Sequence, residues 1–188
     1  SGVGINLDEI ITDTNDDHIL TLVAGAGNIV IDDNVGVNGG AVVSGLIITS
    51  AGDVTFSGAA ATVDLGSDGL VGTSITGDLE FDAAANMSGV FDVNVATLTL
   101  DAALTTTGAN NILITNTGVA DLNALLTSGG TTTFDSTGGI NLGANIVSAG
   151  LVSVANSIVT LSADVQISTT NANITLDEII TDTNDDHI

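Results

Sequence analysis

Apolar and polar residues alternate in short runs along the whole chain, and each run is closed by Gly, Asn, Asp or Ser. A spacing of two residues between apolar positions is the period of a β-strand, whose successive side chains point to opposite faces. Val, Ile and Thr dominate these runs, and such residues favour strands. The pattern predicts short strands and no helix longer than about one turn. The predicted strands are residues 5–7, 19–23, 28–31, 46–49, 53–56, 78–81, 96–100, 111–115, 131–134, 140–142, 151–154, 158–161, 164–167 and 174–176.

The strands recur at a nearly constant spacing in the first part of the chain. The phrases GAGNIVI, SAGDVTF and ITGDLEF end at Ile31, Phe56 and Phe81, which are equally spaced in the sequence, and Leu7 lies almost one further step before Ile31. Such a ladder is typical of stacked coils in a parallel β-solenoid. After Phe81 the spacing changes, and we interpret residues 87–94 and 104–110 as insertions.

The two ends of the chain carry the same sequence. LDEIITDTNDDHI spans residues 7–19 and returns at 176–188, and Ile5-Asn6 is answered by Ile174-Thr175, so 14 of 15 positions agree at an offset of 169. This repeat predicts one tandem unit over residues 5–173 and the start of the next over 174–188. With coils of about 24 residues, the all-β parallel β-solenoid holds roughly seven coils per 169-residue unit, or about 34 Å. In this interpretation Ile174–Leu176 begins again the coil that Ile5–Leu7 begins.

Composition agrees with a solenoid interior. The chain has no Pro, which suits strands that are nearly all central in a sheet. Its four Phe residues are the rings available to stack inside, and Asn near the corners can satisfy backbone groups. Two immunoglobulin-like sandwiches of about 85 residues are the alternative, but the chain lacks Trp and Tyr and shows no half-unit repeat.

Charge narrows the range of partners. The chain has 23 acidic residues, no Lys and no Arg, and a formal net charge of −23. A negative potential of this size disfavours nucleic acid and anionic membrane surfaces, and cations must screen it. No apolar run approaches the length of a membrane span, so we expect no membrane insertion of this segment. The composition suits a saline or calcium-containing extracellular setting.

The repeated segment also contains a candidate calcium site. Asp13, Asn15 and Asp17 reproduce the first three oxygen ligands of a D-x-N-x-D calcium loop, and Asp16 is a further carboxylate. His18 stands where an EF-hand needs Gly, and Ala24 where it needs Glu, so the segment is not an EF-hand. The alternative is a solvated acidic turn. The second copy supplies the equivalent candidate ligands Asp182, Asn184, Asp185 and Asp186.

Catalysis is not expected. The chain has no Cys nucleophile, no second His within the 169-residue unit and no phosphate-binding Gly loop joined to a Lys. Two carboxylates could hydrolyse a glycoside, but the aromatic platforms of sugar sites, Tyr and Trp, are absent. We therefore expect a protein that is not an enzyme and requires no cofactor, with Ca²⁺ as the one candidate ion.

The phrases GAGNIVIDDNVGVNG, SAGDVTFSGAA, LTLDAALTTTGANN and GGINLGANIVSAG resemble the repeats of filamentous-haemagglutinin-like giant exoproteins and autotransporter-type adhesins of bacteria. The resemblance implies a parallel β-helix, export across the outer membrane, and a role as stalk, adhesin or matrix. No functional residue is carried over from it.

Three functions remain as hypotheses. The first is a structural repeat of a giant secreted or cell-surface protein, bacterial or archaeal, whose units join end to end in an extracellular fibre, stalk or adhesin shaft and associate laterally. The second is a calcium-bound S-layer or sheath subunit. The third, an ice-binding solenoid, needs a regular array of Thr-x-Thr, and TLT, TTT and TST occur out of step.

Overall fold

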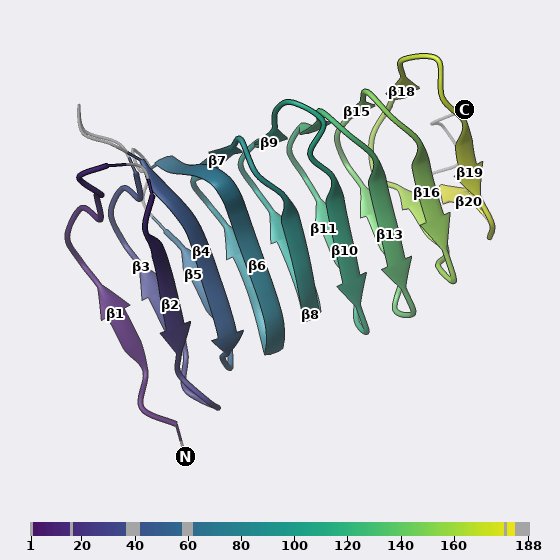
Figure 1. Cartoon of the computed structure of the whole chain (residues 1–188). Coiled ribbons are helices and arrows are strands. Elements are labelled where there is room, and N and C mark those ends of the chain that lie inside the picture. The colour runs from purple at the N-terminus through teal and green to yellow at the C-terminus, as the bar shows by residue number, and fades with distance from the viewer. Residues whose placement is uncertain (1, 16, 37–41, 58–61, 179, 183–188) are drawn as a thin grey trace.

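The computed structural model describes residues 2–15, 17–36, 42–57, 62–178 and 180–182. In these ranges every regular element is a strand, and the strands pair in parallel from one turn of the chain to the next. The turns stack side by side, with β1 at one end of the stack and β20 at the other (Figure 1). The predicted all-β parallel β-solenoid is confirmed. No helix among the described residues is long and apolar enough to cross a membrane.

The stacked strands form three faces, numbered here in chain order. Face 1 consists of β1 (Ile5–Leu7), β3 (Ile29–Ile31), β5 (Val54–Phe56), the end of β6 (Thr62–Phe81), the end of β8 (Phe91–Leu100), β11 (Ala120–Leu122), β14 (Ile140–Leu142), β17 (Val159–Leu161) and β20 (Ile180–Asp182). Face 2 consists of the bridged residues Ile11 and Val35, the start of β6, β7 (Ala84–Met87), β9 (Leu104–Thr106), β12 (Leu126–Ser128), β15 (Ile146–Ser148) and β18 (Ile167–Thr169). Face 3 consists of β2 (Ile19–Val23), β4 (Val43–Ser50), the middle of β6, the start of β8, β10 (Ile112–Asn116), β13 (Thr132–Ser136), β16 (Val152–Ala155) and β19 (Ile174–Leu176).

The coils are longer at the start of the chain than at its end. On face 1, Leu7, Ile31, Phe56 and Phe81 are successive partners, which confirms the spacing predicted from the sequence. The five following steps on this face, which reach Leu100, Leu122, Leu142, Leu161 and Asp182, are all shorter than the three before them. The structure therefore has about eight turns.

The interpretation of residues 87–94 and 104–110 as insertions is wrong. Each of these segments joins a strand of face 2 to a strand of face 3 within a coil that is shorter than those before Phe81. The spacing changes because the later corners have fewer residues and because the register of β6 against β8 shifts between Gly72 and Asp78. A shorter corner shifts the apolar pattern in the sequence just as an insertion would.

Large apolar side chains fill the interior in columns that run along the stack. On face 1 the first and third residues of the three-residue strands from β3 to β17 point inward, and those of β3, β5, β11 and β14 are fully buried. All four Phe side chains lie inside, each at most 1% exposed. The apolar area that these columns remove from water is the main term that stabilises the fold, at about 25 cal/mol per Å².

Side chains at the corners join successive coils outside the strands. Asn28 Oδ1 accepts the backbone N–H of Asp53 at 3.1 Å, and Asp53 Oδ1 accepts that of Asp78 at 3.1 Å. Each of these residues directly precedes a strand residue of face 1. The same kind of bond occurs before strands of faces 2 and 3. There the Oδ1 atoms of Asn34, Asn111 and Asn145 accept the backbone N–H groups of Thr62, Thr131 and Gln166, respectively. Asn and Asp at these corners thus satisfy backbone donors that the ladder leaves free.

Candidate functional site

The predicted calcium segment forms a turn that leads from face 2 to β2 on face 3. Asp13 lies two residues after the bridged Ile11, and its side chain is only 7% exposed. Its carboxylate accepts the backbone N–H groups of Thr14 at 2.5 Å, Asp17 at 3.0 Å and His18 at 2.9 Å. The Asp13 side chain therefore closes the turn through hydrogen bonds to the backbone.

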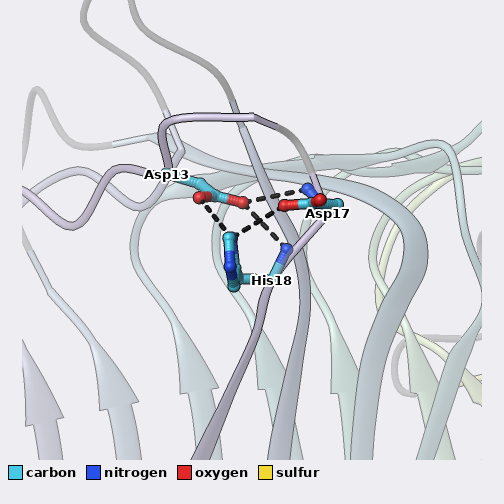
Figure 2. A group of neighbouring side chains, drawn as sticks. All are labelled: Asp13, Asp17 and His18. Carbon is cyan, nitrogen blue, oxygen red and sulfur yellow. Dashed lines mark hydrogen bonds and ion pairs between the residues drawn. The ribbon is translucent and has the colours of Figure 1, made fainter.

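His18 completes this turn. Its Nδ1 lies 2.8 Å from Asp13 Oδ1 and 2.8 Å from Asp17 Oδ1, as Figure 2 shows. The side chains of His18 and Asp17 are 67% and 65% exposed, so the ring sits at the surface above the largely buried Asp13 carboxylate. A protonated ring donates from Nδ1 into the space between two carboxylates, which favours the charged form of the imidazole.

The pKa values of the pair move in opposite directions. The backbone N–H of His18, with those of Thr14 and Asp17 and the His18 ring, holds the pKa of Asp13 far below its ordinary value of 3.8. The hydrogen bond that the His18 ring donates to Asp13, together with the charges of Asp13 and Asp17, raises the pKa of His18 above 6.5. Asp13 therefore stays ionised at any physiological pH, while His18 gains a proton more readily than a free imidazole.

The structure brings together only part of the predicted calcium set. Ligand atoms of Asp13, Asp17 and His18 lie within 4.8 Å of one another, so the segment offers two carboxylates and an imidazole. Asn15 lies in the same turn and contributes a weak backbone contact to Asp13 at 3.5 Å. Asp16 lies outside the described residues. Because Ca²⁺ prefers six to eight oxygen ligands, a bound ion would have to compete with the N–H donors that already engage Asp13.

The second copy of the segment is placed differently. Asp182, which corresponds to Asp13, is the last residue of β20 on face 1 and pairs with Leu161. The other predicted ligands of this copy, Asn184, Asp185 and Asp186, lie outside the described residues. The calcium assignment of both copies stays a prediction.

A second carboxylate cluster was not predicted from the sequence. Glu80 points outward from face 1, Asp82 follows the same strand, and Asp101 occupies the equivalent position one coil later. Their carboxylate oxygens lie within 4.8 Å of one another. Partial burial raises the pKa of Glu80, and the negative charges of Asp82, Asp101 and Asp78 raise it further.

The cluster belongs to a column of polar residues at the corner after face 1. Each member directly follows a strand of this face and donates its backbone N–H to the preceding coil; the members include Asp32, Ser57, Asp82, Asp101, Asn123 and Ser162. Ser57 donates to Asp32, and Asn123 Nδ2 donates to Asp101 at 2.8 Å. Asp82 and Asp101 follow each other without an amide or hydroxyl residue between them, so negative charge concentrates there. In the sequence, the cluster is marked by an Asp directly after each of two strands, Asp82 after LEF and Asp101 after LTL.

The outward positions of the faces carry mostly short polar side chains. Along face 1 the central residues of successive strands are Asn6, Val30, Thr55, Glu80, Thr99, Asp121, Asn141, Thr160 and Thr181. Several are bonded along the stack: Asn141 Nδ2 donates to Asp121 at 2.6 Å, and the Thr160 and Thr181 hydroxyls lie 3.0 Å apart. These contacts tie one coil to the next and present a hydrated surface. The Thr residues alternate irregularly with Asp, Asn and Glu, which gives no ordered Thr array for ice.

Comparisons with protein-family models, with curated proteins and with solved structures found no match to this chain.

Proposed function

We propose that this chain is a non-enzymatic structural repeat of a secreted or cell-surface protein, and that it forms part of an extracellular fibre, stalk or adhesin shaft. The observation that carries the proposal is the uniform parallel pairing on all three faces, from β1 to β20. A solenoid of this kind is a linear object whose length grows with the number of coils and whose neighbours contact only one another. Such a shape suits a spacer or shaft.

The way in which the coils are joined supports a load-bearing role. Adjacent coils are held by strand hydrogen bonds on three faces, by corner bonds such as that from Asp53 N–H to Asn28, and by apolar contacts inside. Force along the axis is therefore shared among several bonds at every step. The last coil leaves strand edges and inward apolar side chains such as Ile174 and Ile180 exposed, 43% and 50% respectively. In the proposed shaft, neighbouring repeat units cover these edges end to end.

The charge of the surface supports an extracellular location for the protein. A shaft built from this chain is a polyanion that shows no Lys or Arg to its neighbours. Its copies repel at low salt and approach laterally only when cations screen them. In the proposed function, lateral self-association therefore depends on the salt of the medium.

Fibre diffraction tests the proposal. An antibody raised against this chain should label filaments on cells that make the full protein. The isolated filaments should give a reflection at about 4.8 Å along the fibre axis, since the strands lie across this axis. Labelling confined to dispersed particles, or filaments whose reflection at that spacing runs across the axis, would contradict the shaft.

A calcium-bound S-layer or sheath subunit is the second candidate function. It is favoured by the approach of Glu80, Asp82 and Asp101 within 4.8 Å in a chain without Lys or Arg, because solution cations must offset this charge. The two functions differ in their response to a chelator. A calcium-bound lattice dissolves in EGTA, whereas filaments held by strand pairing and apolar packing keep their length.

A further inference from the structure

The two copies of the repeated sequence lie on different faces of the solenoid. Ile5, in the first copy, pairs with Ile29 on face 1. Ile174, which stands at the equivalent position of the second copy, pairs with Val152 on face 3. The next apolar position behaves in the same way, because Ile11 is bridged to Val35 on face 2, whereas its counterpart Ile180 pairs with Val159 on face 1. Two independent pairs of strands thus show the same displacement.

The displacement follows from the coil lengths. Seven steps along face 1 lead from Ile5 to Val159, and the chain then passes β18 on face 2 before it reaches Ile174 on face 3. The 169-residue repeat therefore contains seven coils and two thirds of another. Equal coils of about 24 residues would give seven whole coils and return Ile174 to face 1. The shorter coils after Phe81 account for the difference.

The repeated sequence fits both of these faces because face 1 and face 3 use the same inward pattern. Ile5 and Leu7 point inward on face 1, and Ile174 and Leu176 take the inward positions next to Val152 and Val154 on face 3. Both faces accept large aliphatic side chains two residues apart. The residue between them points outward in each copy and is small and polar. A change of face therefore places no charged residue of this strand in the interior.

We propose that successive 169-residue units continue one solenoid with each unit rotated by one third of a turn relative to the unit before it. This inference rests on the proposed shaft function. Any surface group of the unit, such as the Glu80, Asp82 and Asp101 cluster, is then presented on three sides of the shaft in turn. The pattern repeats after three units, or 23 coils, which is about 110 Å at about 4.8 Å per coil.

The rotation determines how such shafts meet. If every unit had the same orientation, one side of the shaft would carry every copy of the acidic cluster, and lateral contacts mediated by cations would form along that side alone. With the rotation, the clusters are about 110 Å apart on each side, and all three sides are equivalent. The partner that fits this surface is another copy of the same shaft, approached from any of three directions. Bundles are expected, whereas single-layer ribbons are not.

Engineered disulfides test the rotation within this chain, which contains no Cys. Thr160 and Thr181 are outward neighbours on face 1, so T160C/T181C should form a disulfide, because adjacent strands lie within the usual Cα separation of a disulfide. S153C/T175C should also form, since these residues are neighbours on face 3. If both copies instead began on face 1, Thr175 would take the place beside Thr160, and T160C/T175C would form.

The triple variant T160C/T175C/T181C makes the two arrangements compete for one thiol. The chain contains three Glu, at positions 9, 80 and 178, so cleavage after Glu separates residue 181 from residues 160 and 175. After mild oxidation of folded protein, the rotated arrangement gives a disulfide that links fragments 81–178 and 179–188, in at least a tenfold excess over the disulfide within fragment 81–178. A disulfide between the thiols at positions 160 and 175, or no disulfide in protein that keeps its β-sheet circular dichroism, overturns the rotation. The fibre reflection at about 4.8 Å does not depend on this result, so a disulfide pattern that contradicts the rotation leaves the proposed shaft function intact.

Discussion

Phe56 and Phe81 stack face to face inside the solenoid, with ring centroids 4.5 Å apart and ring planes within 9° of parallel. They occupy the same inward position on face 1 in successive coils, so the strand spacing sets the ring separation. Phe91, at the start of β8, packs against Phe81 at 6.0 Å with a tilt of 59°. Phe81 thus joins face 1 to face 3 across the interior, and these three of the four Phe residues form the largest aromatic group of the core.

Replacement of Phe81 by Ala should therefore be among the most destabilising single changes. The ring is fully buried, and its loss leaves a cavity beside both Phe56 and Phe91, which predicts a decrease of about 3–5 kcal/mol in the free energy of unfolding. Thr99→Ala is the matched control, because Thr99 lies outward beside Glu80 and its loss should change stability by about 0.5 kcal/mol or less. Urea unfolding followed by circular dichroism, with hydrogen exchange at β5, β6 and β8, measures both. Equal effects of the two changes would contradict the stacked core.

Buried hydroxyl groups donate to backbone carbonyls where face 2 turns toward face 3. Ser128 is 2% exposed and donates to the carbonyl of Thr131 at 3.1 Å, and Ser148 donates to that of Gly130 at 2.9 Å. Thr106 and Thr169 make the corresponding bonds in the coils before and after, to Asn110 and Ala172. This inward position lies within the ladder of face 2, because Ser128 pairs with Ser148 and Ser148 with Thr169. Earlier coils have Leu65 and Met87 at the same position, so a hydroxyl replaces an apolar side chain only from Thr106 onward.

Ser128→Ala should reveal the contribution of this hydroxyl column. The change leaves the backbone N–H of Gly130 without its acceptor, Ser128 Oγ at 3.2 Å, which predicts a loss of about 1–3 kcal/mol, although Ala is the more apolar residue. Thr127→Ala, one residue earlier and outward on the same strand, should cost about 0.5 kcal/mol or less. Thermal unfolding of both variants provides the measurement. A Ser128→Ala protein as stable as the parent would show that the hydroxyl is dispensable.

The hydroxyl column also explains which part of the fold the sequence pattern could predict. Some strands of faces 1 and 3 have Val, Ile or Leu at both inward positions, and of these β3 and β16 were predicted to within about one residue. On the same two faces β11, with Ala120 inward, and the start of β8 were missed. Most of face 2 was missed, because its strands β7, β9, β12 and β15 read AANM, LTT, LTS and IVS. Ala, Ser or Thr at one inward position weakens the apolar alternation. Periodicity therefore detects a strand most readily where both inward residues are large and apolar.

The candidate sites show a similar limit. Asp13, Asp17 and His18 are close in sequence, so a local pattern could predict that they meet. The Glu80, Asp82 and Asp101 cluster depends on the short step from Phe81 to its partner Leu100, and this coil length is set by corner geometry. A pattern based on the longer coils before Phe81 places Asp101 away from Asp82. Contacts between coils were thus predictable only where the coil length stayed constant.

Glu80→Gln should stabilise the protein at neutral pH. The pKa of Glu80 is raised above 4.5, so the ionised side chain disfavours the folded state wherever the pH exceeds this raised pKa. As the pH falls, the folded protein takes up the proton first, and the penalty disappears below the ordinary value of 4.5. We expect a gain of about 0.5 kcal/mol at pH 7 that vanishes near pH 4, measured by urea unfolding across this range.

Asp92→Asn is the matched control for Glu80→Gln. Asp92 is exposed on face 3, and its replacement removes the same unit of negative charge away from the cluster. A gain specific to the cluster should exceed that of Asp92→Asn at pH 7, and the excess should shrink as Ca²⁺ or NaCl is added, because cations screen the three carboxylates. Identical gains for the two variants would mean that total charge alone sets the effect.

His18 provides a second pH dependence of the same sign, at higher pH, because both groups bind their proton more tightly in the folded state. Its raised pKa means that the protonated ring favours the closed turn, an effect fully present below 6.5 and lost as the pH rises through the raised value. Asp13→Asn removes the negatively charged hydrogen-bond partner that is the largest cause of the raised pKa of His18. The His18 titration midpoint should therefore fall toward 6.5 in NMR titrations of the imidazole C–H signals. The parent chain has a second His, at position 187, and His187→Gln assigns the signals. Asp92→Asn should leave the His18 midpoint unchanged, because Asp92 lies on face 3 away from the turn. If both changes shifted the midpoint equally, overall charge, and not the bond to Asp13, would raise the pKa of His18.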